Sequence, residues 1–192
     1  LNVLGNLQAV AIAIPLGFLI GLVPLFNSMF NRYLDVLRFA PLPVFTGVFI
    51  VLFGIGSIVK VQFLAFATFV YLLPVVVQRL DETNKVYEDT AFTLGAKQSD
   101  LLSTLYLPDT LSRLYDDIRV LLAISWTYIT IVEVIVMSGG IGALAYSCRR
   151  TGRIDMIFAI VLIIFLWGIL QDLFLKWFKK ILFPFVNSES YR

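Results

Sequence analysis

Long intervals without a charged residue are the feature that most constrains this chain. No Asp, Glu, Lys or Arg occurs from Leu1 to Asn31, and further uncharged intervals follow along the sequence. A helix of about 20 apolar residues crosses the roughly 30 Å hydrocarbon layer of a bilayer. Only helices and closed barrels satisfy every backbone N–H and C=O in that layer. These intervals therefore predict a protein that crosses a membrane several times.

The intervals predict five membrane spans, which cover Leu7 to Phe26, Phe39 to Val59, Val61 to Gln78, Val120 to Met137 and Met156 to Leu175. Only Lys60 separates the second span from the third, which predicts two antiparallel helices joined by a tight turn around Gly56. The intervals are apolar at both odd and even positions, whereas the strands of a membrane barrel alternate polar and apolar residues. We therefore predict an all-α integral membrane protein, a polytopic helical bundle that forms one domain over residues 1–192.

Composition excludes most soluble functions. Hydrophobic residues make up 59% of the chain and charged residues 15%, against about 45–50% and about 25% in soluble domains. The chain has no His and one Cys, so it cannot build a His-based catalytic triad, a Cys/His zinc cluster or a disulfide framework. It also has no G-x-x-x-x-G-K-[ST] phosphate loop and no basic cluster interleaved with aromatic residues. We expect no catalytic residue, no metal, no cofactor on this chain and no nucleic-acid partner; its surroundings are a lipid bilayer.

One polar segment, residues 79–118, interrupts the apolar intervals and holds twelve of the charged residues. Placing this segment in the cytoplasm puts most Lys and Arg residues on the cytoplasmic side, as is typical of membrane proteins. The segment predicts two short helices, one from Val86 to Leu94 that Gly95 ends, and one from Asp100 to Leu107 that Pro108 ends. Helices this short are marginal alone in water. We therefore expect a partner protein to support them.

The same segment carries a resemblance to a known family. The stretch from Glu88 to Gly95, followed thirteen residues after the glycine by Pro108, resembles the cytoplasmic EAA loop of ABC importer permeases. The resemblance covers roughly residues 8–175. Within this family, the sequence is similar to the nitrate/sulfonate/taurine/bicarbonate group at four stretches: Leu37 to Pro43, Phe53 to Gly56, Leu111 to Glu133 and Gly140 to Gly142.

The resemblance implies a type I ABC importer permease fold in the inner (plasma) membrane, commonly with six spans, of which we expect the first to precede Leu1. It implies pairing with a second permease copy, expected to be identical, with two cytoplasmic ATPase subunits that bind ATP and Mg, and with an extracytoplasmic substrate-binding protein. The chain would then form the solute pathway by alternating access and would not itself be an enzyme. Small oxyanions such as nitrate, bicarbonate or a sulfonate such as taurine are the suggested solutes, and a thiamine precursor or riboflavin is the alternative.

The loop residues that couple such a permease to its ATPase carry over by position to Asp89, Ala91, Gly95 and Pro108. Two positions depart from the family pattern, because Asp89 replaces a glutamate and Thr90 replaces an alanine. Glu88 keeps the longer acid one residue earlier, which on a helix is a rotation of about 100°. The sequence leaves open whether Glu88 or Asp89 serves as the loop acid.

The fourth predicted span holds an unusual density of polar side chains, and the candidates for lining a solute pathway are Ser125, Trp126, Thr127, Thr130 and Glu133. Hydroxyls also join membrane helices to one another, so a structural role stays open for them. A carboxylate inside the membrane costs about 2.5–3.5 kcal/mol on insertion scales. Glu133 is therefore either functional or a structural acid near the outer interface, bonded to backbone or to Arg119 of a neighbouring subunit.

Two alternatives from other classes remain. An ion-coupled secondary transporter or channel would use an intramembrane charge such as Glu133, but it leaves the spacing from Gly95 to Pro108 unexplained. A purely structural membrane scaffold would tolerate charged replacements from Ser125 to Thr130.

Overall fold

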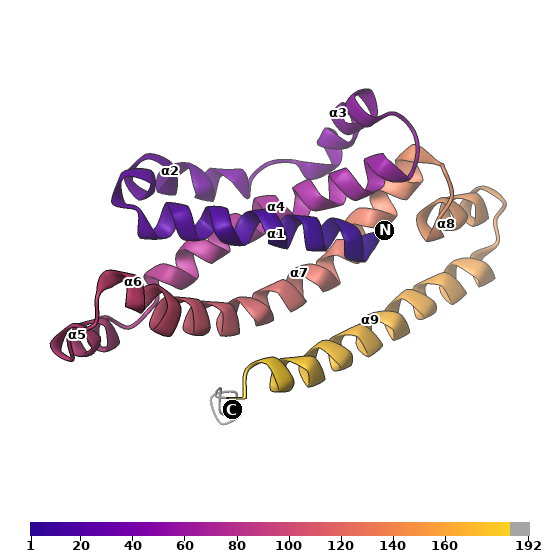
Figure 1. Ribbon diagram of the computed structural model, residues 1–192. Coiled ribbons are helices and arrows are strands. Elements are labelled where there is room, and N and C mark those ends of the chain that lie inside the picture. The colour runs from indigo at the N-terminus through magenta and orange to yellow at the C-terminus, as the bar shows by residue number, and fades with distance from the viewer. Residues whose placement is uncertain (185–192) are drawn as a thin grey trace.

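The computed structural model describes residues 1–184, apart from the side chains of Gln98 and Ser99. Within this part of the chain every regular element is a helix (Figure 1). In chain order the elements are α1 (Asn2–Leu22), α2 (Pro24–Leu37), α3 (Leu42–Phe53), α4 (Ser57–Asp81), α5 (Lys85–Thr93), α6 (Gln98–Leu101), the π-helical turn η1 (Leu102–Tyr106), α7 (Leu107–Val136), α8 (Ile141–Arg150) and α9 (Ile154–Leu182). The all-α prediction is confirmed.

Four helices are long and apolar enough to cross a bilayer: α1, α4, η1 continued by α7, and α9. The pair α2 and α3 qualifies only as one span that is bent by 103°. The described residues therefore contain four candidate spans, or five if the bent pair counts as one, which agrees with the prediction of about five.

The predicted bounds of the first two spans are wrong, and proline is the reason. The helix predicted from Leu7 to Phe26 ends at Leu22, because Val23 is extended before Pro24. The predicted span from Phe39 to Val59 is only the twelve-residue α3, which begins after Pro41. A residue before proline is pushed away from the helical conformation, and proline itself is tolerated in a first helical turn.

The tight turn between the second and third predicted spans lies at Gly54 and Gly56, as expected near Gly56. Gly54 has φ +74° and Gly56 has φ +158°, values that glycine adopts readily because it has no Cβ. Lys60, however, does not lie in this turn. It lies in the first turns of α4 and is only 3% exposed.

Close packing between α1 and α4 forms the centre of the bundle. A Cβ built on Gly17 would lie 2.5 Å from Val76 Cγ1, and one built on Gly21 would lie 2.7 Å from Leu80 Cδ1. Small residues let membrane helices approach this closely, and packing of this kind drives their association because lipid is as apolar as the side chains. Val76 and Leu80 belong to the buried core that α1, α4 and α7 share.

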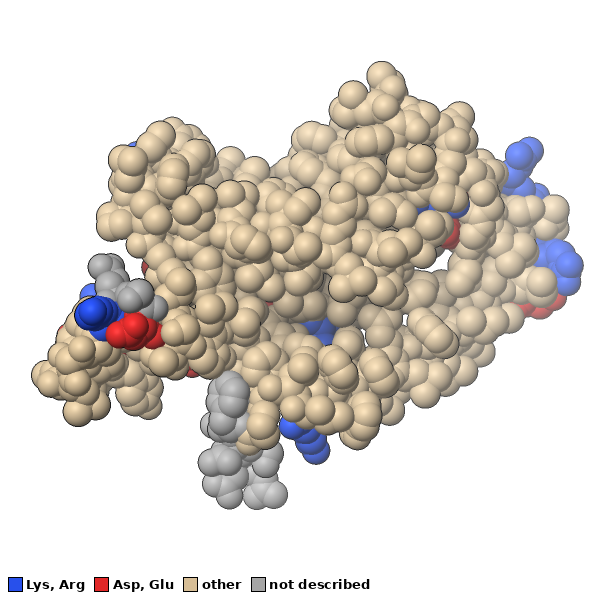
Figure 2. Space-filling model, in the orientation of Figure 1, with Lys and Arg blue, Asp and Glu red and all other residues tan. Residues whose placement is uncertain are grey.

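The polar segments lie at opposite ends of the bundle. Figure 1 shows α5 and α6 at one end, and α8 at the other. Most of the charged side chains visible in Figure 2 lie toward these two ends, and the surface between them is largely uncharged. This distribution fits a protein whose middle lies in lipid.

Replacing Gly17 with Leu should weaken the α1–α4 contact. Overpacking a close contact costs about 1–3 kcal/mol, so we expect the midpoint of thermal unfolding in detergent to fall by several degrees. Gly168→Leu on α9 is the matched control, because nothing lies within 4 Å of a Cβ at that position. Equal midpoints for the two variants would contradict the packing role of Gly17.

Candidate functional site

Local backbone hydrogen bonds fix both ends of the loop helix α5. At the start, Asn84 Oδ1 accepts from the Val86 N–H at 3.0 Å, which is an N-cap. At the end, the Ala96 N–H donates to the Ala91 carbonyl and the Gly95 N–H to the Phe92 carbonyl. This pair of bonds is a Schellman motif, which needs a left-handed residue, and Gly95 has φ +87°. The prediction that Gly95 ends this helix is confirmed.

The helix α5 presents a largely exposed surface. None of its residues is buried, and its large apolar side chains are exposed: Val86 64%, Tyr87 61% and Phe92 46%, with Leu94 at 83% just beyond its end. Isolated exposed apolar residues are ordinary, but four on one short helix and its cap form a patch that a partner could cover. No described segment of this chain covers it.

The two loop acids face different surroundings. Asp89 is exposed, whereas Glu88 is half-buried and lines a small cavity of about 170 Å³ with Tyr106 and the C-terminal end of α4. Glu82, at the end of α4, has a charged donor of its own: a hydrogen bond from Arg79 lowers the pKa of its carboxyl group. Asp89, at the family's acid position, is therefore the loop acid that a partner could reach directly.

The second loop helix differs from its prediction. Pro108 does not end it, because α6 continues through the π-helical turn η1 into α7, with Pro108 in the first turn of α7. The Leu107 N–H donates to the Leu102 carbonyl, five residues back. This wider turn places the proline ring at the start of a new helix, where its missing N–H is tolerated. The loop is thereby joined to a membrane span without an intervening coil.

The pathway candidate Ser125 belongs to a buried polar cluster that joins three helices. Ser125 Oγ donates to Asn2 Oδ1 at 2.9 Å and accepts from Asn6 Nδ2 at 3.1 Å, and Thr68 donates to Asn6 Oδ1 at 2.7 Å. All four residues are buried. The cluster links α1, α4 and α7, which is the structural role that hydroxyls often have in membranes.

Sequence reasoning missed Asn2, Asn6 and Thr68. A signal was available for the first two, because asparagines four residues apart lie on the same face of a helix. Their side chains are costly in an apolar span unless they are hydrogen-bonded. The partner of such a pair cannot be read from sequence, since Asn6 and Ser125 are 119 residues apart.

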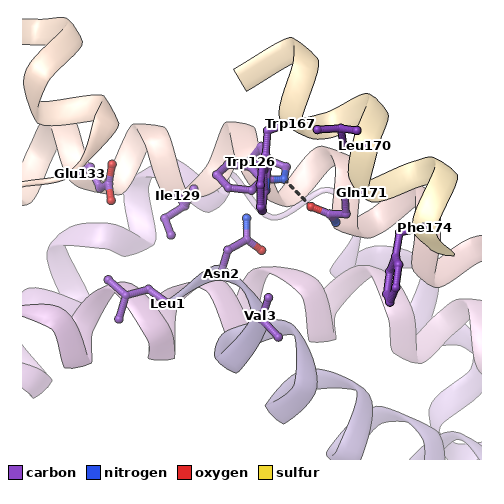
Figure 3. Close-up of a pocket in the computed structure, with 10 residues that line it drawn as sticks. All are labelled: Leu1, Asn2, Val3, Trp126, Ile129, Glu133, Trp167, Leu170, Gln171 and Phe174. Atoms are coloured by element: carbon purple, nitrogen blue, oxygen red, sulfur yellow. Dashed lines mark hydrogen bonds between the residues drawn. The ribbon is translucent and has the colours of Figure 1, made fainter. Parts of the chain in front are cut away.

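Two other pathway candidates, Trp126 and Glu133, line a cavity of about 620 Å³ between the start of α1, α7 and α9 (Figure 3). Trp126 Nε1 donates to Gln171 Oε1 at 2.9 Å. Asn2 Nδ2 points toward Trp126 (Figure 3) and has no hydrogen-bond partner. The walls also include Trp167 and Phe174 and contain no Lys or Arg. The cavity therefore combines aromatic surfaces with amide groups.

The remaining hydroxyl candidates do not line this cavity. Thr127 is exposed on α7, and Thr130 Oγ1 donates to the carbonyl of Trp126 one turn earlier. The structure thus brings Trp126 and Glu133 to one cavity, places Ser125 in the helix contact, and leaves Thr127 facing outward.

Glu133 lies in a buried cluster with Lys60 and the start of α8. Its Oε2 accepts from the Gly142 N–H at 2.8 Å, and its Oε1 lies 3.9 Å from Lys60 Nζ. Lys60 donates to the Gly139 carbonyl at 2.5 Å. A Cβ on Gly140 would lie 2.1 Å from the Glu133 carboxyl carbon. The carboxylate therefore bonds the backbone that begins α8, as one of the two structural alternatives predicted, and its ion-pair partner within the described chain is Lys60.

Among the residues that the structure describes, no group of three or more His, Cys, Asp or Glu could hold a metal ion. The helices, the exposed loop at one end and the buried polar clusters define a polytopic membrane protein of the permease type. A family model described as "Binding-protein-dependent transport system inner membrane component" matches residues 13–187, and the chain belongs to this family.

Relatives with described functions are similar over most of this chain. The taurine transport system permease protein TauC of Escherichia coli is 24% identical over 92% of this chain and 64% of its own length. The bicarbonate transport system permease protein CmpB of Synechococcus elongatus is 27% identical over 90% and 62%. The formylaminopyrimidine transport permease protein ThiX of Halalkalibacterium halodurans is 27% identical over 93% and 73%. The chain thus spans a little under two thirds of the first two relatives.

A solved structure shares the fold. A chain from the "Crystal structure of an amino acid ABC transporter with histidines" superposes with a TM-score of 0.66, covering 92% of this chain and 88% of that one at 18% identity. The expected permease fold and the resemblance to the nitrate/sulfonate/taurine/bicarbonate group are confirmed.

Replacing Glu133 with Ala should destabilise the fold strongly. The change leaves Lys60 without its carboxylate and the Gly142 N–H without its acceptor, and breaking a buried pair costs about 3–5 kcal/mol. We expect a large fall in the thermal unfolding midpoint in detergent, and a smaller one for Lys60→Met with Glu133→Gln, which removes the charges and keeps an acceptor. Asp155→Ala, in an exposed pair with Arg153, is the control. A Glu133→Ala midpoint equal to that control would refute the structural role.

Proposed function

We propose that the protein is the membrane-spanning subunit of an ATP-driven importer, which moves a small solute by alternating access while separate subunits hydrolyse ATP. The observation that carries the proposal is the loop helix α5, whose ends are fixed by caps while its apolar side chains stay exposed. A short helix of this kind gains its stability from packing. The family membership supports a transport role, and a cytoplasmic ATPase is the partner that fits the exposed patch.

The loop is built to pass a displacement into the membrane. Because α6, η1 and α7 follow one another without a break, movement of the loop moves the end of a membrane span. Asp89 and the apolar side chains of α5 are the groups that would contact the ATPase. A second copy of this chain and an extracytoplasmic binding protein complete the proposed assembly.

Two solute classes deserve a direct comparison. The names of the taurine and bicarbonate relatives favour a small oxyanion. The cavity favours the alternative, an uncharged ring such as a thiamine precursor, because its walls carry aromatic, aliphatic and amide groups and the Glu133 carboxylate, with no Lys or Arg to attract an oxyanion. Glu133 gives no support to ion coupling, since it bonds Gly142 and lies beside Lys60.

The central test is assembly and uptake. We expect the full-length permease, coexpressed with the ATPase and binding protein encoded beside it, to copurify with that ATPase. In vesicles, labelled taurine, bicarbonate and formylaminopyrimidine should be compared, and one should enter only when ATP is present. Uptake driven by an ion gradient without nucleotide, or no ATPase in the purified assembly, would overturn the proposal.

Gly95 offers a sharper test of the loop. Apart from its chain neighbours, no described atom lies within 4 Å of a Cβ at this position, so substitution strains chiefly the left-handed backbone, by about 1–2 kcal/mol. Gly95→Leu should insert normally but lose ATPase copurification or ATP-driven uptake. Gly95→Asn, whose side chain tolerates this conformation, should retain most of both. Full uptake by Gly95→Leu would count against the coupling role.

A further inference from the structure

The helix α9 makes little apolar contact with the rest of the chain. Of its 29 residues only Ile160 is buried. In a membrane, apolar contact alone does not hold two helices together, because lipid tails are as apolar as the side chains. Whatever fixes α9 to its neighbour must therefore be close packing or polar bonds.

Polar bonds connect α9 to α7 in the half of α9 that lies nearer the loop. The antiparallel helices are joined by Trp126 to Gln171, by Arg119 Nε to Asp172 Oδ1 at 2.9 Å, and by the Tyr115 hydroxyl to the Leu175 carbonyl at 3.0 Å. These contacts lie between the middle of α7 and its loop end.

The contacts nearest the loop form a charged cluster, which consists of Asp116, Arg119, Asp172, Lys176 and Lys179. Arg119 bonds Asp116 at 2.8 Å as well as Asp172, and Lys179 also bonds Asp116. Lys176 lies 2.8 Å from Asp172. Exposed single ion pairs contribute little. This cluster differs because its carboxylates are shared and the Arg119 and Lys179 side chains are only 19% and 12% exposed.

The neighbouring residue, Asp117, joins α7 to a different helix. Arg79 on α4 donates to Asp117 through Nε at 2.7 Å and through Nη2 at 2.8 Å, a bidentate pair that fixes orientation as well as distance. Successive helical residues point about 100° apart. Asp116 and Asp117 therefore connect α7 to two different helices at one level.

This level lies close to the loop. Asp116 and Asp117 follow Pro108 by eight and nine residues, or about 12–14 Å along the helix. Between them and α6 the chain is continuous helix, and the non-helical residues 94–97 separate α6 from α5. A displacement of the loop therefore reaches these two carboxylates before it reaches the polar cluster at Ser125 or the cavity beside Trp126.

We propose that Asp117 and Asp172 are positioning residues of the transport cycle, which fasten α7 to α4 and, together with Asp116, to α9, so that the three helices move as one body when the loop is displaced. The inference rests on the proposed function. In this proposal α9 moves with α7 because ion pairs join the two helices. The helix α1 moves with α4 because the two are closely packed at Gly17 and Gly21.

The test measures the α7–α9 distance and the coupling separately. Spin labels are placed at Val120 and Leu173, both exposed, in the full assembly in lipid nanodiscs, with Cys148→Ser to remove the natural thiol. In the parent protein we expect one narrow distance distribution that is unchanged between the nucleotide-free and ATP-trapped states. Asp172→Asn should broaden the distribution and make it depend on nucleotide, and Asp172→Glu should restore it.

The same variants report on transport. With the solute found in the uptake comparison, Asp172→Asn and Asp117→Asn should each lower the solute imported per ATP hydrolysed by at least tenfold while ATP hydrolysis continues. Asp117→Glu should recover most of that ratio. Asp155→Asn, which removes a charge from the exposed pair at the other end of α9, should leave both readouts unchanged.

The outcomes separate the two proposals. If the parent assembly imports no solute with ATP, the proposed function fails and the inference with it. If the parent works and both Asn variants keep its distance distribution and its coupling ratio, the inference alone is overturned. A lower unfolding midpoint with a normal coupling ratio also overturns it, because the ion pairs would then be stabilising only.

Discussion

A peptide group inside lipid has no water to bond, and each unsatisfied N–H or C=O there costs several kcal/mol. The long helices α1, α4, α7 and α9 satisfy this constraint because their backbone N–H and C=O groups bond to one another within each helix. Breaks in the chain are therefore placed at helix ends, as at Val23 before Pro24 and at Gly54 to Gly56. Near Pro108 a π-helical turn keeps the helix continuous from the polar loop into the span.

The same solvent decides how the helices associate. Since lipid competes equally for apolar side chains, α1 joins α4 by close approach at glycines, and α9 joins α7 by polar bonds. Buried polar clusters occur where three elements meet: Ser125 with the asparagines of α1, and Glu133 with Lys60 and the start of α8. Polar side chains in the spans are thus chiefly connections between helices.

The polar loop of residues 79–118 follows different physics because it lies at the end of the bundle, beyond the apolar surface. Its geometry is local, set by Asn84 at one end of α5 and Gly95 at the other. This is why Gly95 could be assigned from sequence alone. Pro108 could not be, because the same residue either follows one helix or begins the next, and the π-helical turn that decides between them has no sequence signature. Whether Glu88 or Asp89 faces outward likewise depended on the rotation of α5 against the bundle.

By itself the sequence determined the all-helical membrane fold and the position of the polar loop, because the charge-free intervals and the glycine cap each depend on a short stretch of chain. Only the tertiary structure decided which polar residues meet. Lys60 and Glu133, Asn6 and Ser125, and Arg119 and Asp172 are each more than 50 residues apart. Their pairing depends on how the helices are rotated and aligned in register, which is fixed by packing between distant segments.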